Sequence, residues 1–308
     1  MLKFNKMCGI SMIYRRFFLL LIISGLLVGC SALAVSRDQL GQTLSNESLK
    51  YLPEEVSETS GLALFGGYLW TINDSGGKDA VYAFGAQDYE FEKRIKIGGS
   101  KNIDWESLAQ TDKHLFIADC GNNKGKRKTL DIYKVSWEKL IKAKDKEKVT
   151  AKKISFQYTD RGEDDPGKEH NYDCEALTVV GEKLWLFTKN RGDLQSRLYI
   201  LNAKKSQQAV RSSVTLPVSG LITAADYNQK TGKLVLLGYQ KASVFGQSFI
   251  WIIDVKSDLP VWESARYHTI LPYGQWEAVI WQDDKTLLLT SEKSPLGTQQ
   301  VGRLRLSD

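Results

Sequence analysis

Five copies of one short pattern recur along the chain, and this recurrence constrains the fold more than any other feature. In each copy a pair such as Leu62-Ala63 is followed by a polar turn and then by an apolar strand such as LWTINDSG. A repeat of about 50 residues or less is typical of architectures built from similar units. The spacings between equivalent positions are 46, 69, 48 and 54 residues, and those positions hold Ser60, Glu106, Glu175, Thr223 and Glu277.

Each copy also contains short runs that look like further strands. In the first copy these runs are DAVYAF at 79–84 and FEKRIKI at 91–97, which are rich in β-branched and aromatic residues and bounded by turns. Four antiparallel strands repeated about five times are typical of a β-propeller. We therefore predict an all-β chain with five four-stranded antiparallel blades. A count of six blades is the alternative, because the long second repeat or the N-terminal stretch could contain a degenerate blade.

The last copy has no clear fourth strand after Leu306, whereas SLKYLP at 48–53 is a strand candidate outside any copy. In a closed ring, a strand from one terminus commonly completes the blade formed by the other and removes exposed edges. We therefore expect this N-terminal segment to become the outer strand of the last blade.

The longest spacing contains an insertion at 136–153 in which Trp137, Leu140 and Ile141 share one helical face among many lysines. We expect a short helical insertion in blade two. One interpretation is a solvated helix or loop; the other is a basic patch that meets anionic lipid head groups.

The first 29 residues have the pattern of an export signal. Arg15 and Arg16 precede an apolar run at 17–23 that is too short for a stable membrane span. LVGC at 27–30 resembles the lipobox of bacterial lipoproteins, which implies a signal peptide at 1–29 and acylation of Cys30 with palmitate-type chains. The residue after this Cys is Ser31 rather than Asp, and in Gram-negative lipoproteins this implies that the protein is located at the outer membrane. An ordinary signal peptide remains the alternative. We expect a lipidated linker at 30–47 and one propeller domain at 48–308.

Charge excludes one class of partner. The chain has 42 basic and 36 acidic residues, but residues 1–29 carry four of the basic ones and no acidic residue. The mature chain is therefore close to neutral, and nucleic acid is not expected as a partner.

The innermost strand of a blade and its neighbour run in opposite directions, so the start of one and the end of the other lie on the same face. This geometry predicts a strongly acidic rim around the channel. Crowded carboxylates raise one another's pKa values unless a cation intervenes. The predicted rim residues are Glu58, Asn73, Asp74, Asp104, Glu106, Asp119, Asp173, Glu175, Lys189, Glu277 and Glu292.

Two explanations of this rim stay open. A hard cation with oxygen ligands, calcium above all, could be held by Glu106, Asp119, Asp173 and Glu175. Alternatively, the carboxylates accept hydrogen bonds from backbone N–H groups of the adjacent blade and hold the ring together. No cofactor other than calcium is expected.

Cys120 and Cys174 are the two cysteines of the exported globular part, and the propeller geometry places both on this rim in neighbouring blades. Because an exported compartment permits disulfides, we predict a Cys120–Cys174 bridge. Two separate packed thiols are the alternative.

Several motifs together resemble a family of secreted bacterial β-propeller proteins, found as lipoproteins, whose activity is not established. The motifs are TSGLALFGGYLWTINDSGG, NIDWESLA, IADCGNN, YDCEALTV and LFTKNRG, and the resemblance spans about residues 56–295. More distantly, SGLA followed by LWTINDSG resembles phytase-like and esterase-like propellers. That likeness implies calcium at the channel and ester hydrolysis, although the basic clusters of alkaline phytases are not recognisable.

Two functions follow from these observations. The first is an envelope lipoprotein, anchored to the membrane through its N-terminal lipid, whose rim binds a small molecule, a glycan or an envelope protein, with or without calcium. The second is a calcium-assisted phosphoesterase or esterase. The first is favoured because the sequence contains no GxSxG, HExxH or phosphate-binding glycine loop. Whether the protein is an enzyme stays open.

Overall fold

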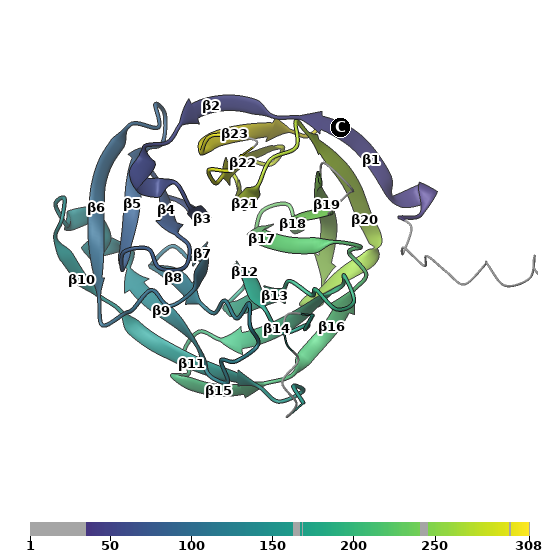
Figure 1. The fold of residues 1–308 in the computed structure, drawn as a ribbon, viewed down its shortest axis with the longest axis horizontal. Coiled ribbons are helices and arrows are strands. Elements are labelled where there is room, and N and C mark those ends of the chain that lie inside the picture. The colour runs from purple at the N-terminus through teal and green to yellow at the C-terminus, as the bar shows by residue number, and fades with distance from the viewer. Residues whose placement is uncertain (1–34, 163–166, 168, 241–245, 296, 308) are drawn as a thin grey trace, which may run out of the picture. The chain divides into compact units, whose positions relative to one another are not determined.

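The computed structural model describes residues 35–307 apart from 163–166, 168, 241–245 and 296, and five β-sheets form a ring in this part of the chain (Figure 1). Each inner strand contacts the inner strand of the next sheet, and the fifth contacts the first. The ring confirms the predicted β-propeller and its count of five blades. The signal and lipidation predictions at 1–30 lie outside the described residues.

Four strands form the antiparallel body of each blade. The inner strands are β3 (Thr59–Phe65), β7 (Trp105–Gln110), β12 (Cys174–Val180), β17 (Leu221–Asn228) and β21 (Trp276–Trp281). The second strands are β4 (Tyr68–Asn73), β8 (His114–Asp119), β13 (Lys183–Thr188), β18 (Lys233–Gln240) and β22 (Thr286–Ser291). The third strands are β5 (Ala80–Gly85), β9 (Leu130–Ser136), β14 (Ser196–Asn202), β19 (Gln247–Lys256) and β23 (Gln300–Arg305). The fourth strands are β6 (Phe91–Gly98), β11 (Lys152–Tyr158), β16 (Ser212–Leu216), β20 (Leu259–Leu271) and β2 (Glu47–Tyr51).

The N-terminal segment closes the ring as expected. Strand β2 pairs antiparallel with β23, with Glu47 opposite Arg303, and so completes the fifth blade. The propeller begins earlier than the predicted boundary at residue 48. A 3-10 turn, η1 (Arg37–Gln39), and strand β1 (Leu40–Ser45) precede it, and β1 pairs in parallel with β20 of the fourth blade. The sequence missed β1 because its side chains are mostly exposed and show no apolar alternation.

Two further short strands cover outer edges. Strand β10 (Lys148–Thr150) pairs in parallel with β6 of the first blade, and β15 (Gln207–Val210) pairs in parallel with β11 of the second. A second 3-10 turn, η2 (Glu54–Val56), links β2 to the first inner strand. A bare edge strand can pair with other chains. Strands β1, β10 and β15 cover the outer edges of the fourth, first and second blades, so three of the five blades are protected in this way.

The core is divided into five clusters, each lying between two adjacent blades. Trp70 and Trp105, for example, are fully buried in the cluster between the first and second blades. Burying such aromatic rings between sheets contributes most of the favourable energy of blade packing. The repeated tryptophans of the sequence therefore pack the ring.

Hydrogen bonds also join the inner strands around the channel. The Ser60 hydroxyl donates to the Glu106 carbonyl of the next blade, and the Thr223 hydroxyl donates to the Trp276 carbonyl over 3.0 Å. The Ser107 hydroxyl accepts the Leu177 N–H over 3.1 Å. These bonds fix the position of each blade relative to its neighbour.

A β-bulge interrupts every inner strand near its start. The pairing with the second strand shifts between Trp105 and Ser107, between Cys174 and Ala176, and at the equivalent point of the fourth and fifth blades. In the first blade the shift lies one residue later, between Ser60 and Leu62. A bulge leaves one residue unpaired and changes the direction of its side chain. In the second, third and fifth blades the residue left out of the pairing is a glutamate, and these are Glu106, Glu175 and Glu277.

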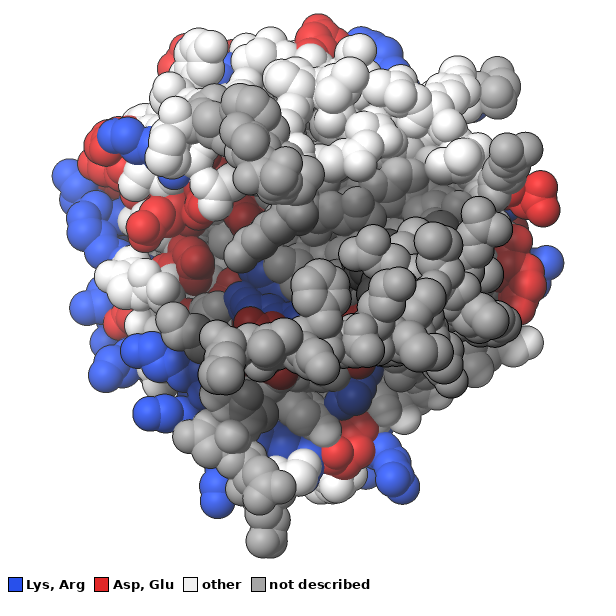
Figure 2. All heavy atoms as spheres, turned by 45° about the vertical axis from the view of Figure 1, so that its right-hand side comes forward, with Lys and Arg blue, Asp and Glu red and all other residues white. Residues whose placement is uncertain are grey.

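The predicted insertion contains one short helix, α1 (Trp137–Lys142), which packs on the first blade although it follows β9 of the second. The Trp137 ring stacks on Phe65 at 4.7 Å between centroids, and Lys93 donates to the carbonyls of Leu140, Ile141 and Ala143 at its C-terminal end. Among the described residues, no helix is both long enough and apolar enough to cross a membrane. Lysine and arginine gather at the left edge of Figure 2 with Asp and Glu between them, which is typical of a solvated surface.

Gly61 lies where the first and second blades pack closely against each other. Its φ is +65°, and a Cβ there would lie 2.4 Å from the Leu108 backbone nitrogen of the next blade. Gly67 has a φ of +81° with no atom within 4 Å of such a Cβ.

We expect Gly67→Ala to cost about 1–2 kcal/mol from the left-handed backbone alone. Gly61→Ala should cost at least about 1–3 kcal/mol more, because backbone must move. Urea unfolding of both variants would measure this difference, and equal losses would contradict it.

Candidate functional site

One end of the channel gathers the predicted rim residues, because all five inner strands begin there and all five second strands end there. Six of the eleven predicted residues line a single cavity of about 150 Å³ at this end, together with Ser60, Asn123, Tyr239 and Gln275. We call this end the acidic mouth. The six predicted residues are Asp74, Glu106, Glu175, Lys189, Glu277 and Glu292.

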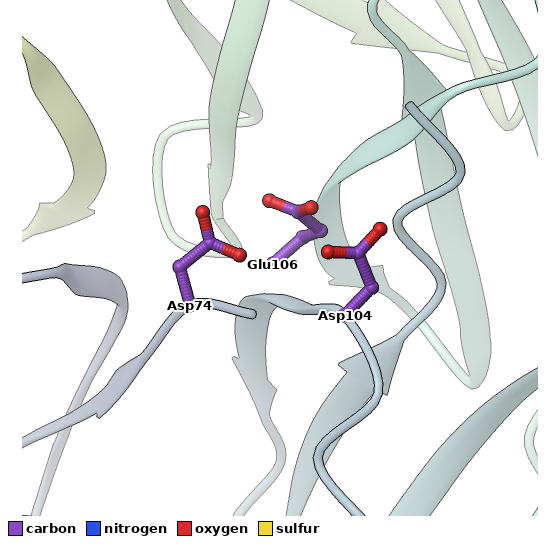
Figure 3. A group of neighbouring side chains, drawn as sticks. All are labelled: Asp74, Asp104 and Glu106. Atoms are coloured by element: carbon purple, nitrogen blue, oxygen red, sulfur yellow. The ribbon is translucent and has the colours of Figure 1, made fainter. Parts of the chain in front are cut away.

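Three carboxylates of the acidic mouth converge on one point (Figure 3). Asp74 follows β4 of the first blade, whereas Asp104 precedes β7 of the second blade and Glu106 lies within it. One carboxylate oxygen of each lies within 4.8 Å of the corresponding oxygens of the other two. We call this group the three-carboxylate cluster. It shares Glu106 with the four metal ligands predicted from the sequence and adds Asp74 and Asp104.

Glu106 is the most unusual member of the cluster. It lies at the bulge of β7, only 5% of its surface is exposed, and its Oε1 accepts no hydrogen bond within the described structure. An unsatisfied buried polar atom costs about 1–3 kcal/mol, and more when it is charged. Such an atom in a native fold calls for a missing partner, and an ion is one of the partners that satisfies it.

Gly121 has no side chain, and this leaves space for the carboxylates of Glu106 and Asp104. A Cβ at residue 121 would lie 2.2 Å from Glu106 Oε1 and 2.4 Å from the Asp104 carboxyl carbon. The φ of Gly121 does not require glycine, since it lies outside the left-handed region. The requirement is therefore for space, and glycine here brings the backbone of the 119–123 loop against the two carboxylates.

Asp119 and Asp173 are occupied by structural contacts. Asp119 is fully buried, accepts the Asp104 N–H over 3.0 Å and pairs with Arg127 at 3.2 Å. Asp173 is also fully buried, accepts the Asn122 N–H from the neighbouring blade over 2.6 Å and pairs with Arg191. Asp173 acts as the second explanation of the rim supposes, since it binds a backbone N–H of the adjacent blade. Asp119 differs, because the N–H that it binds belongs to its own blade.

Lys189 neutralises part of the mouth. Its Nζ lies 3.1 Å from Glu175 Oε2 and 5.7 Å from the centre of the Tyr239 ring. Burial alone would lower the pKa of Lys189, but the Glu175 and Glu277 carboxylates outweigh it and raise that pKa well above its usual value. Lys189 therefore stays protonated, and Glu175 has a cationic partner that the three-carboxylate cluster lacks.

The remaining predicted residues lie around this centre. Glu292 Oε1 accepts the Gln275 side-chain amide over 2.6 Å, and Glu277 is partly buried beside it in the cavity. Glu58 is exposed, and its carbonyl accepts the Asp74 N–H over 2.9 Å. Asn73 donates to the Glu55 carbonyl over 2.7 Å, while its Oδ1 is buried without a donor from the described chain.

The predicted disulfide is confirmed. Cys120 and Cys174 form a bridge with a Cα–Cα distance of 5.3 Å, and both are fully buried. The bridge joins the end of β8 to the start of β12, directly before Gly121 on one side and Glu175 on the other. It therefore holds two neighbouring blades together beside the acidic mouth.

Three carboxylates of the mouth have raised pKa values, and burial is the largest cause in each. Burial, assisted by Asp74 and Asp173, raises the pKa of Asp104 to about 6. Burial and Glu277 raise the pKa of Glu292 to about 7. Burial followed by Glu175 and Asp74 raises the pKa of Glu106 well above its usual value. The ring thus holds carboxylates whose ionised forms are destabilised without a counter-charge.

A divalent cation matches the three-carboxylate cluster in ligand type and spacing. Calcium binds oxygen ligands at about 2.4 Å, so two ligands on opposite sides of the ion lie up to about 4.8 Å apart. Magnesium binds at about 2.0–2.1 Å, demands near-ideal octahedral geometry and usually keeps several water molecules, whereas calcium accepts irregular sets of protein oxygen atoms. Calcium is therefore the ion we consider for this cluster of side chains.

Gln275 and Gly121 are among the residues of the site that were not predicted from the sequence. Gln275 lines the cavity and precedes Trp276-Glu277 as Asp104 precedes Trp105-Glu106, so the repeat alignment could have found it. Gly121 stands in DCGNN, but only the folded positions of Asp104 and Glu106 show that its missing side chain matters.

Comparison with known proteins identifies no family for this chain. No family model matches the chain, and no curated protein is similar to it in sequence. Among solved structures, the catalytic domain of a Coprinopsis cinerea GH62 α-L-arabinofuranosidase has a TM-score of 0.49 at 8% identity and covers 87% of this chain and 97% of its own. An α-L-arabinofuranosidase from Podospora anserina, in complex with cellotriose, has a TM-score of 0.47 at 9% identity, covering 86% and 97%.

A third similar structure is the Kuenenia stuttgartiensis hydrazine synthase, with a TM-score of 0.42 at 11% identity over 79% of this chain. The chain spans 58% of the length of that protein. At these identities and TM-scores, none of the three indicates an activity for this chain. The fold and its mouth define a class: a five-bladed β-propeller whose channel opens at one end into a small acidic cavity.

The raised pKa values predict how stability depends on pH. An unfolded glutamate has a pKa of about 4.3, whereas folded Glu292 has one of about 7. Because the folded state binds this proton more tightly, the stabilisation is present below about pH 4 and is lost as pH rises through about 7. In chelator-treated protein, the melting temperature of the wild type should therefore fall relative to Glu292→Gln between about pH 5 and about pH 8. Exposed Glu263→Gln is the control, and parallel pH profiles for all three proteins would contradict the expectation.

Proposed function

We propose that the protein binds a calcium ion at the acidic mouth and, through it, an envelope ligand or partner. Asp74, Asp104 and Glu106 would hold the ion. The observation that carries the proposal is the buried Oε1 of Glu106, which has no donor in the described structure although it faces two further carboxylates. The three-carboxylate cluster has a high charge density, and a hard cation is the partner that such a group favours.

The arrangement supports a role in binding. Calcium takes six to eight oxygen ligands, so three carboxylates leave positions for water and for oxygen atoms of a ligand. When bound, the ion would supply a positive centre for a carboxylate or hydroxyl group. Asp74 belongs to one blade and Asp104 to the next, so the ion would also link two blades at the mouth.

Hydrolysis of an ester is less well supported than binding. The cavity holds about 150 Å³, whereas pockets for organic molecules usually measure about 300–1,000 Å³. The Ser60 hydroxyl, the one serine oxygen of the cavity lining, already donates to the Glu106 carbonyl. Neither feature suits a site that must admit an ester and attack it.

We further propose that the protein is exported and anchored to the bacterial envelope, at the outer membrane, by acyl chains on Cys30. The arginine pair, the short apolar run and LVGC at 27–30 support this proposal, as does the motif resemblance to secreted bacterial propellers. A disulfide is stable in an oxidising compartment and rare in the cytosol, so the Cys120–Cys174 bridge agrees with export.

Calcium binding can be measured by calorimetry and by thermal unfolding. We expect calcium to raise the melting temperature of chelator-treated protein, with about 2.7 kcal/mol of stabilisation at 100 times its dissociation constant. Glu106→Gln should weaken binding at least tenfold, about 1.4 kcal/mol, since an amide replaces a charged ligand. Gly121→Ala should also weaken it by displacing the two carboxylates.

Exposed Glu263→Gln is the matched control, because it removes a carboxylate far from the cluster in sequence and should bind calcium as the wild type does. An unchanged melting temperature with calcium would contradict the proposal. So would equal affinity in Glu106→Gln.

The anchor can be tested in a Gram-negative host by labelling with radioactive palmitate and by membrane fractionation. The wild type should carry the label and sediment with the outer membrane, because several acyl chains give stable anchoring. Cys30→Ala should lose both the label and the sedimentation. Unlabelled wild-type protein, or a Cys30→Ala variant that still sediments, would refute lipidation at this residue.

A further inference from the structure

The opposite mouth of the channel holds a second and larger hollow of about 480 Å³. It is formed where each inner strand turns into its second strand, and all five blades contribute to it. Its volume lies within the range of about 300–1,000 Å³ usual for organic ligands, whereas the acidic mouth holds only about 150 Å³. By size, the acidic mouth suits an ion and the opposite mouth suits an organic molecule.

Asp226 is one of the carboxylates that line this hollow. It directly follows the buried part of β17, and one of its oxygens accepts the Trp281 N–H over 2.9 Å while the other accepts the Thr178 hydroxyl over 3.3 Å. The Tyr227 backbone N–H also stabilises the ionised form of Asp226. A carboxylate has about four acceptor positions, so Asp226 retains capacity for a donor from a ligand. Burial raises the pKa of Asp226 to about 7, so the protein alone does not fully stabilise its ionised form at neutral pH.

The charges that line the hollow favour a cation. Asp112, Asp226, Asp283 and Asp284 line it against Lys230, which already forms an ion pair with Asp284. Hydrogen bonds from backbone N–H groups, that of Lys285 first, lower the pKa of Asp283, so this residue is ionised. A negatively charged ligand would be repelled by these carboxylates.

Aromatic side chains complete the lining. Phe65, Tyr227 and Trp281 come from three different blades. Aromatic rings beside a carboxylate are a favourable environment for an alkylammonium group, because the ring faces attract a cation and the methylene groups find apolar contacts. A carboxylate alone would bind any cation, and an aromatic ring alone would bind any apolar group. Together they favour a ligand that has both an ammonium group and a hydrocarbon chain.

We propose that the opposite mouth binds an organic amine, whose ammonium group donates hydrogen bonds to Asp226 and whose hydrocarbon chain contacts the aromatic lining. This site is separate from the calcium site, and its existence does not depend on calcium binding.

The test uses two probes of the same length, hexamethylenediamine and hexanediol, titrated calorimetrically into the mature chain. The diamine should bind and the diol should not, since only the diamine carries charge. Binding should persist at saturating calcium, which separates this site from the acidic mouth. Diamine that competes with calcium, or diol that binds as tightly as diamine, would overturn the proposal.

Two variants locate the site. Asp226→Asn should weaken diamine binding about tenfold or more, because a hydrogen bond to a charged acceptor is lost. Asp112→Lys changes an exposed turn residue and should also weaken binding without affecting the fold. Asp254→Asn is the control, since Asp254 pairs with Lys233 at 3.2 Å and does not line the hollow.

The pH dependence adds an independent readout. An alkylammonium stays charged below about pH 10, so Asp226 should control the profile. Diamine affinity should rise from about pH 6 to about pH 8 in the wild type, as Asp226 ionises around pH 7. The rise should be absent in Asp226→Asn. Unchanged affinity in both Asp226→Asn and Asp112→Lys would exclude the site.

Discussion

Ring closure gathers buried and half-buried ionisable side chains at one end of the channel, and the structure of the acidic mouth depends on how their charge is balanced. Arg127 and Arg191 balance Asp119 and Asp173, and Lys189 balances Glu175. The three-carboxylate cluster has no comparable cation in the described structure. Burying a charge without a partner is among the most costly features that a fold can retain.

The ring can tolerate this cost because it fixes the backbone on every side. Five apolar clusters hold the blades together, and side-chain hydrogen bonds join consecutive inner strands. The Cys120–Cys174 bridge ties the 119–123 loop to the third blade. Hydrogen bonds hold the backbone of Glu106 and that of Asp104 in place. A preorganised set of oxygen atoms of this kind favours an ion that compensates its charge.

The repeat could be recognised from sequence because each copy buries the same apolar positions, and recurrence at equal positions survives even when identities differ. It correctly predicted β2 as the closing strand, since the last copy lacked one. The rim residues followed from strand direction alone. Strand direction could not show that Asp119 is hydrogen-bonded while Glu106 Oε1 is not, because this difference depends on which backbone N–H groups each carboxylate contacts after folding. Strand β1 was missed for a related reason: its pairing with β20 uses backbone groups and almost no apolar side chains.

The two mouths of the channel differ in size and in chemistry. The acidic mouth is small and concentrates carboxylates at the bulges of the inner strands, whereas the opposite mouth is larger and combines aspartates with aromatic side chains. A propeller fold does not determine a function, so these local differences carry the functional argument.

The most direct test of the central claim is a crystal structure of the mature chain grown with calcium, with anomalous scattering data to locate the ion. The account predicts one anomalous peak bounded by Asp74, Asp104 and Glu106, with Glu106 Oε1 among the ligands. A mouth without such a peak, in which Glu106 Oε1 accepts a hydrogen bond from water or protein instead, would contradict it.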